Sequence, residues 1–277
     1  MKEFGKPGLK AWLFLLFYFL LVVYALVYEP NNLIVTRNSF DLVDGSGGPV
    51  PVRVVFISDI HAGLQRDGYL DAVVDKVNEQ EPDIVLIGGD VIESGASELD
   101  LLAPLSRLNA SYGKFAVLGN HDYGWWGCGT TNATADEVEG KLENLGIDVL
   151  RNEHRIIGGS GGFALIGVDD DWSCYDDYNA AAAGVPDSMP KIILAHNTNS
   201  VNAAAVKGPG LVLAGHTHCG LVRVPVLTES ALGWGFGSVL GGRRELDADT
   251  EAYVTCGVTG GGIRVLTSPE ISVIDLE

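Results

Sequence analysis

Side chains that bind metal ions are concentrated in five short polar segments of this sequence. The seven donors among them are Asp59, His61, Asp90, Asn120, His196, His216 and His218. Carboxylate, imidazole and amide groups suit divalent ions such as Mn, Fe, Zn or Mg. Seven donors are too many for one ion and about the number that two ions need. Because two divalent ions roughly 3.5–4 Å apart form a clamp for in-line displacement at phosphorus, the donors predict phosphoester hydrolysis.

Each of these segments also has an ordinary structural explanation. A lone Asp after a strand is usually a turn former or a helix cap, and a lone His is more often a core residue than a ligand. Five of the six histidines nevertheless lie in these segments, and His154 is the exception. Taken together, the segments therefore favour a metal site over a set of unrelated turns.

The donor segments follow stretches that are typical of buried strands. Short apolar, β-branched runs at 52–58, 83–89 and 114–119 precede the first donors, and runs at 191–195 and 211–215 precede the last. Ligands in open α/β sheets collect outside the carboxyl ends of the strands. We therefore expect the donors to meet there.

Helical segments alternate with the first of these strands. Apolar residues at helical spacing predict helices at 69–81 and 99–109, and a capping box of Thr134 and Glu137 predicts a third at 134–146. This alternation predicts an α/β fold with a partly parallel sheet. Further strands are predicted at 155–157, 163–168, 253–258 and 271–276, with a short helix at 199–206.

The motifs stand in an order that resembles the calcineurin-like metallophosphoesterases. The resemblance rests on Asp-x-His at 59–61, Gly-Asp at 89–90, Gly-Asn-His-Asp at 119–122, His196 and Gly-His-Thr-His at 215–218. It covers roughly residues 52–277. It implies a four-layer αββα sandwich, with two mixed sheets flanked by helices. It also implies a metal-dependent phosphoric ester hydrolase that binds two divalent metal ions.

The same resemblance implies a role for each donor. One ion would be held by Asp59, His61, Asp90 and His218. The other would be held by Asp90, Asn120, His196 and His216. His121 would contact the substrate phosphate and protonate the leaving oxygen, while Asp122 would orient its imidazole and raise its basicity.

A narrower resemblance is to a membrane-anchored bacterial subgroup that includes UDP-2,3-diacylglucosamine hydrolases. It rests on an apolar N-terminal segment, Gly-Val-Asp-Asp at 167–170, residues 215–221 and a terminal strand after 268–271. The subgroup commonly has Gly-Gly-Gln where this chain has Cys-Gly-Leu at 219–221, and Pro in place of Thr198. The narrower resemblance implies a lipid-linked substrate of lipid A biosynthesis.

An uncharged apolar run occupies residues 11–28 and follows Lys2, Lys6 and Lys10. Its 18 residues are close to the roughly 20 that span a bilayer, so the run predicts a single-pass membrane anchor. A cleaved signal peptide is the alternative, but the run lacks an A-x-A-like cleavage site. Because a basic flank favours the cytoplasm, we expect the catalytic domain to be extracytoplasmic. A surface-lying segment that docks a cytoplasm-facing enzyme is the other alternative.

The net charge of −18 divides unevenly along the chain: residues 1–28 carry +2 and residues 29–277 carry −20. This negative charge argues against a nucleic-acid partner. Bound metal ions can reverse the field locally, so a phosphorylated small-molecule or lipid substrate remains compatible with it. Apolar residues make up 47% of the chain, which excludes a disordered polymer.

The sequence divides into a membrane anchor at 1–28, a linker at 29–51 and one catalytic domain at 52–277. Its four cysteines form no C-x-x-C pair, so no structural zinc site is expected. Disulfides are permitted outside the cytoplasm, and the sequence leaves open whether Cys128, Cys174, Cys219 and Cys256 form them. Beside His218, we interpret Cys219 as a small packing residue rather than a nucleophile.

Two further groups of side chains have both a functional and an ordinary reading. The first group consists of aromatic residues in loops, which could stack on a lipid or nucleoside or simply pack within their loops. They are Trp125, Trp126, Trp172 and Tyr175. The second group consists of basic side chains, which could bind a diphosphate or form surface salt bridges. They are Arg243, Arg244 and Arg264.

These features predict a membrane-anchored, binuclear metal-dependent phosphoesterase. Its first expected substrate is a lipid-linked phosphoester or diphosphate such as UDP-2,3-diacylglucosamine. A phosphomonoesterase or phosphoprotein phosphatase acting on soluble substrates is the alternative. A non-catalytic, metal-stabilised membrane sensor or scaffold is the alternative from another class, and the pairing of His121 with Asp122 argues against it. The sequence carries no signal for an oligomeric state.

Overall fold

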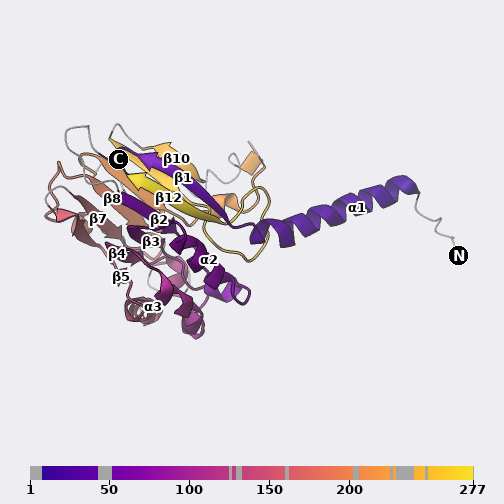
Figure 1. Ribbon diagram of the computed structural model, residues 1–277, viewed down its shortest axis with the longest axis horizontal. Coiled ribbons are helices and arrows are strands. Elements are labelled where there is room, and N and C mark those ends of the chain that lie inside the picture. Colours follow the sequence, from indigo (N-terminus) through magenta and orange to yellow (C-terminus); the bar gives the residue numbers. More distant parts are fainter. Residues whose placement is uncertain are drawn as a thin grey trace.

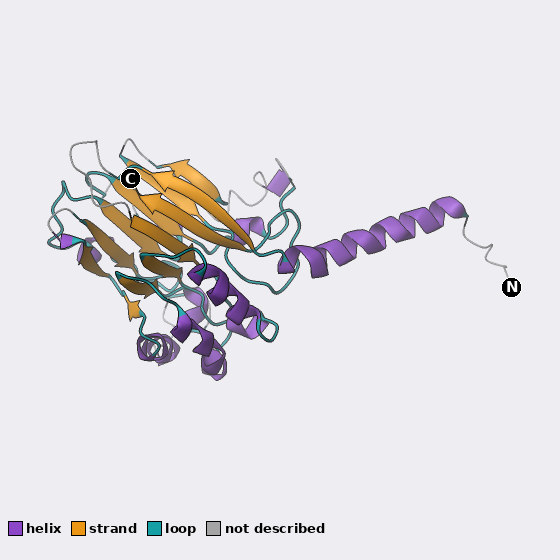
Figure 2. Ribbon diagram, in the orientation of Figure 1, coloured by secondary structure: helices purple, strands orange, loops and turns teal. Residues whose placement is uncertain are grey.

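Two six-stranded sheets pack face to face, and helices lie on their outer faces (Figure 1 and Figure 2). The computed structural model describes residues 8–42, 52–124, 127–128, 133–159, 162–201, 206–224, 227–228, 240–246 and 249–276. The arrangement is the four-layer αββα sandwich expected from the sequence, preceded by an apolar N-terminal helix.

Both sheets are mixed. The first has the spatial order β1 (Ile34–Phe40), β12 (Glu270–Leu276), β2 (Val52–Ile57), β3 (Ile84–Gly88), β4 (Gly113–Val117) and β5 (Asp148–Val149). The second has the order β10 (Gly242–Glu245), β11 (Thr250–Val254), β9 (Gly210–Ala214), β8 (Lys191–Ala195), β7 (Phe163–Val168) and β6 (Glu153–Ile157). The pairs β12–β2, β10–β11 and β6–β7 are antiparallel, and the other neighbours are parallel.

The central strands are buried on both faces. Phe56, Leu86 and Leu165 belong to the apolar layer between the two sheets. The outer face of the first sheet packs against α2 (Tyr69–Asn78) and α3 (Ala133–Asn144), and α4 (Tyr178–Ala181) packs on the second sheet. Strands covered on both faces read as continuous apolar runs. This is why the sequence predicts them well.

Two expected helices differ in detail from the structure. The segment expected as a helix at 99–109 forms consecutive 3-10 turns over Ala96–Arg107. Pro104 lies inside it, and proline removes a backbone donor that a regular α-helix needs. The expected capping box at Thr134 is wrong, because α3 begins at Ala133 and Thr134 already lies in its first turn.

The expected linker at 29–51 is wrong for its central part, because it contains β1. This strand pairs in parallel with β12 along its whole length. It lies at the edge of the sheet and is only partly buried, so its sequence lacks a continuous apolar run. Strands β5 and β10 were also missed, and both are short edge strands. Of the short helix expected at 199–206, Thr198–Ser200 forms a 3-10 turn and residues 202–205 lie outside the described residues.

The N-terminal helix projects from the sandwich (Figure 1). It consists of α1 (Leu9–Val23), which continues through Tyr24–Tyr28 and Glu29–Asn31 as one helical segment of 23 residues. This segment is long and apolar enough to cross a membrane. Its last turns contact the domain through a hydrogen bond, in which the Arg264 backbone N–H donates to the Ala25 carbonyl at 3.0 Å.

All four cysteines form disulfides, which pair Cys128 with Cys174 and Cys219 with Cys256. The sequence left the pairing open. Cys219 is buried and has no free thiol, which agrees with the interpretation that it is not a nucleophile, but it also forms a covalent link that this interpretation did not include. Disulfides persist in oxidising compartments, so the two bonds suggest a domain outside the cytoplasm.

Candidate metal centre

The seven donors expected from the sequence lie just beyond the carboxyl ends of strands from both sheets. They follow β2, β3, β4, β8 and β9 in the order Asp59, His61, Asp90, Asn120, His196, His216 and His218. Parallel pairing within each sheet brings neighbouring strand ends together, and the face-to-face packing of the sheets adds the second group to the first.

The donor atoms form overlapping clusters within which all lie less than 4.8 Å apart. These clusters are Asp59–His61–His218, His61–Asp90–His121 and Asp90–His196–His216. Asp90 Oδ2 lies 3.1 Å from His196 Nε2 and 3.6 Å from His61 Nε2. Asp90 therefore connects the two sides of the centre.

The backbone is in an unusual conformation at the donor positions. Five donors have left-handed φ values between 45° and 67°, namely Asp59, His61, Asp90, His216 and His218. Residues other than glycine rarely adopt this region, and such strain gathers at functional sites. The fold thus holds these side chains in place at a local energetic cost.

Several buried donor atoms make no hydrogen bond with the described residues. They are Nε2 of His61, Oδ1 of Asn120 and Nδ1 of His218. Unsatisfied buried polar atoms are uncommon in native proteins and require an explanation. Together with the carboxylates of Asp59 and Asp90, they make a donor set that divalent cations fit.

The electrostatics of the centre also suit cations. Burial opposes the ionisation of Asp59 and Asp90, but the neighbouring histidines outweigh it and hold the pKa of both carboxyls below the usual value. Burial lowers the pKa of His216 and of His218 to about 4. Burial also opposes protonation of His61 and His196, but Glu93 beside His61 and Asp90 beside His196 outweigh it and raise the pKa of both rings. Because neutral imidazoles ligate metals, cation binding would release the protons of these two rings.

Hydrogen bonds fix the orientation of two donor rings. Nδ1 of His196 donates to the Gly88 carbonyl at 2.7 Å, which leaves Nε2 facing Asp90. Nδ1 of His61 lies 2.6 Å from Oε2 of Glu93, which leaves Nε2 of His61 facing the Asp90 carboxylate. Such outer contacts set the ring tautomer in metal sites.

Glu93 is a site residue that sequence reasoning missed. Its carbonyl accepts from Nδ1 of His121 at 2.7 Å, and its carboxylate lies 3.5 Å from the same atom. The backbone N–H of His121 donates to Asp90 Oδ1 at 2.8 Å. The available signal was an acidic residue three positions after Asp90, in the loop that leaves β3.

The expected role of Asp122 is wrong. Its carboxylate accepts hydrogen bonds from the backbone N–H groups of Val91 at 2.9 Å, Ile92 at 3.2 Å and Gly119 at 2.9 Å. Asp122 lies in a 3-10 turn, where successive side chains point about 120° apart, so it diverges from His121. Burial raises the pKa of its carboxyl to about 7. Asp122 braces the donor loops, and Glu93 holds the His121 ring.

The expected aromatic contacts divide into two kinds. Trp172 lies edge-on to the ring of His216, with centroids 4.4 Å apart, so it borders the centre. Tyr175 stacks on Tyr123 and therefore packs within the protein, as the ordinary reading held. Trp125 and Trp126 lie outside the described residues.

Both alternatives expected for Arg264, a diphosphate grip and a surface salt bridge, are wrong. Its side chain is fully buried and donates to the carbonyls of Thr259, Thr267 and Cys256. It therefore fixes the backbone of one loop. Arg243 forms an ion pair with Glu251 on the neighbouring strand, which matches the ordinary reading. Arg244 is exposed on β10.

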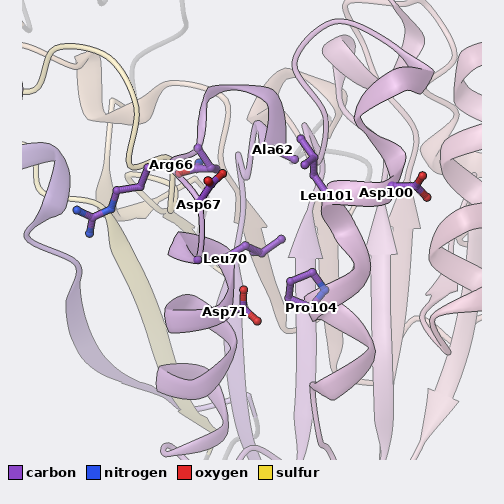
Figure 3. A pocket seen from close by; sticks show the side chains of 10 residues that line it. Ala62, Arg66, Asp67, Leu70, Asp71, Asp100, Leu101 and Pro104 are labelled. Carbon is purple, nitrogen blue, oxygen red and sulfur yellow. The ribbon is translucent and has the colours of Figure 1, made fainter.

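A pocket of about 270 Å³ lies beside the loop that follows His61 (Figure 3). Its lining includes the carboxylates Asp67, Asp71 and Asp100 together with apolar residues such as Leu101. One guanidinium, that of Arg66, also lines the pocket, so its carboxylates outnumber its cations and disfavour a phosphate group there.

Comparisons with known proteins agree with this centre. The calcineurin-like phosphoesterase family matches residues 52–220. An uncharacterized metallophosphoesterase of Helicobacter pylori is 30% identical over 237 residues, covering 81% of this chain and 60% of the relative. The chain thus spans about 60% of the length of that relative.

Two other relatives carry more specific names. The transmembrane protein with metallophosphoesterase domain of Danio rerio is 32% identical, covering 82% of this chain and 53% of the relative. The phosphodiesterase YaeI of Escherichia coli is 28% identical, covering 82% of each chain. The His and Asp clusters are consistent with the binuclear metal site of metallophosphoesterases. This chain belongs to the calcineurin-like phosphoesterase family.

Proposed function

We propose that this chain is a membrane-anchored phosphodiesterase that uses two divalent cations. The observation that carries the proposal is the position of Asp90, whose carboxylate lies between His61 on one side and His196 on the other. One cation would be held by Asp59, His61 and His218, and the other by His196 and His216, with Asp90 shared between them. Asn120, whose buried Oδ1 makes no hydrogen bond with the described residues, would complete the second set.

When bound, such cations would act as a Lewis-acid clamp on the phosphoryl oxygens. The chain itself would position the metal-binding side chains and transfer one proton to the leaving oxygen. Because Nδ1 of His121 donates to the Glu93 carbonyl, Nε2 is the ring atom that would give a proton to the leaving oxygen. His121 is only half-buried, so substrate can reach it.

The anchor would be the apolar helix that includes residues 11–28. The three lysines before it favour a cytoplasmic N-terminus, which would place the hydrolase domain outside the cytoplasm. The two disulfides support that side of the membrane. A transmembrane relative also carries a metallophosphoesterase domain.

The substrate would be a phosphodiester or diphosphate carried on a lipid, because an anchor confines the enzyme to the bilayer surface. UDP-2,3-diacylglucosamine is one such compound. The burial of Arg264 removes one side chain that could grip its diphosphate, so simpler phosphodiesters are equally worth testing.

The test uses the purified full-length chain in detergent, loaded in turn with Mn, Fe, Zn or Mg. The substrates are bis-p-nitrophenyl phosphate, p-nitrophenyl phosphate and UDP-2,3-diacylglucosamine. The proposal expects hydrolysis of bis-p-nitrophenyl phosphate with at least one metal and faster turnover than of p-nitrophenyl phosphate. Absence of hydrolysis with every metal would support a non-catalytic scaffold instead.

A further inference from the structure

A cluster of exposed apolar side chains lies beside the base of the N-terminal helix. It comes from two loops, whose described parts are 218–224 with 227–228 and 256–267, and consists of Leu221, Val222, Val224, Leu227, Ile263 and Leu266. We call it the apolar rim. Leu227 is 66% exposed and Leu266 59%. Contiguous exposed apolar patches mark sites of protein or membrane interaction.

The apolar rim sits at the level of the membrane segment. The backbone N–H of Arg264, between Ile263 and Leu266, donates to the carbonyl of Ala25 at 3.0 Å. Ala25 belongs to the apolar run 11–28, and only three residues separate it from the end of that run. An α-helix rises about 1.5 Å per residue, and the π-helical segment Tyr24–Tyr28 rises less, so the contact lies at most about 4–5 Å inside the apolar end. That depth is the boundary between headgroups and acyl chains.

Residues 219–223 of the first loop are bonded to the second loop. The backbone N–H groups of Val265 and Arg223 donate to the carbonyls of Leu221 and Val265, each at 2.9 Å. The disulfide between Cys219 and Cys256 joins the starts of the loops. The buried guanidinium of Arg264 ties three carbonyls of the second loop together. The exposed apolar side chains are therefore held outward rather than free to fold inward.

The same two loops reach the metal centre. Leu221 follows the donor His218 by three residues, which is at most about 10 Å of extended chain. In the second loop, the Thr259 hydroxyl donates to the carbonyl of the donor Asp59. A surface that sits in the bilayer boundary would thus hold the centre close to lipid headgroups.

We propose that the apolar rim inserts into the outer boundary of the same bilayer that the N-terminal helix crosses, and that it presents the metal centre to phosphate groups carried on lipids. The occupant of this surface is the acyl–headgroup boundary itself, because the apolar rim is continuous with the apolar helix through the contact at Ala25. This inference rests on the proposed membrane anchor and adds the orientation of the domain relative to the bilayer.

The test places the photo-crosslinking residue benzoylphenylalanine at position 266 of the full-length chain in nanodiscs of phosphatidylcholine and phosphatidylglycerol. A second variant carries it at position 227. The matched control carries it at Ile156, which is also apolar and 45% exposed but lies on β6, at the edge of the second sheet beyond β7. In Figure 1, β7 lies at the end of the domain away from α1.

Mass spectrometry after illumination counts covalent lipid adducts. The inference expects adducts at 266 and 227 and none at 156. Absence of adducts at both rim positions, or equal adducts at 156, overturns it. Hydrolysis of bis-p-nitrophenyl phosphate by each variant shows that it is folded. If the unaltered chain lacks that hydrolysis, the proposed activity fails, while the adducts still decide the pose of the domain.

Discussion

Oδ2 of Asp90 lies 3.1 Å from Nε2 of His196, although the two residues belong to different sheets of the sandwich. Asp90 follows β3 in the first sheet and His196 follows β8 in the second. Their contact shows that the metal centre is built across the interface of the sheets. The packing of the two sheets therefore positions the donors as much as any single loop does.

His121→Ala should keep the metals but lower turnover. The loss should be about 10²–10⁴-fold, which is typical when a proton-transferring side chain is removed. The measurement is kcat for bis-p-nitrophenyl phosphate together with metal content. His154→Ala is the matched control, because His154 lies on β6 outside the donor clusters. Unchanged kcat in the His121 variant would remove that residue from the proposed mechanism.

Glu93→Ala should weaken metal binding without abolishing the fold. The carboxylate lies 2.6 Å from Nδ1 of His61 and holds that ring, and loss of such a contact typically costs 10–100-fold in metal affinity or activity. Metal titration of the stripped protein measures the effect. Glu93→Gln should restore part of the affinity, because its amide oxygen can still accept the hydrogen bond. A Glu93→Ala protein with the affinity of the unaltered chain would contradict this role.

Asp122→Ala should reduce stability more than the Glu93 change does. It leaves three buried backbone N–H groups without their acceptor, and one such group costs about 1–3 kcal/mol. We expect a loss of several kcal/mol at most, measured by denaturant unfolding of the purified chain. If stability is unchanged and only turnover falls, Asp122 acts on catalysis rather than as a brace.

Removing the disulfide with Cys219→Ser and Cys256→Ser together should also destabilise the domain. The bond closes a loop with a sequence separation of 37, for which chain entropy predicts about 4 kcal/mol. The measurement is the unfolding midpoint of the double variant against that of the unaltered chain without reductant. Equal midpoints would show that the bond adds nothing to stability.

The sequence predicted the parts of the fold that are buried on both sides. β3 is entirely apolar and was recognised, whereas β1 is an edge strand whose partly exposed residues include Arg37 and Asn38. Six of the seven expected donors lie in the clusters of metal-binding side chains, because their positions follow from strand ends. The seventh, Asn120, directly precedes the clustered His121 in the turn after β4. The partner of His121 could not be predicted, since it depends on how the loop after β3 folds over the turn after β4. The family resemblance implied Asp122, whereas in the structure Glu93 contacts the His121 ring.

We propose that Asp90 joins two cation sites into one catalytic centre. The most direct test of this proposal is the metal content of the purified full-length chain and of Asp90→Ala, measured by plasma mass spectrometry beside hydrolysis of bis-p-nitrophenyl phosphate. Asp71→Ala is the matched control, because Asp71 forms an exposed ion pair with Arg107. We predict about two ions per chain for the unaltered protein and the control. Asp90→Ala should lose both bound metal and hydrolysis. An Asp90→Ala protein that keeps its ions and its hydrolysis would contradict the account.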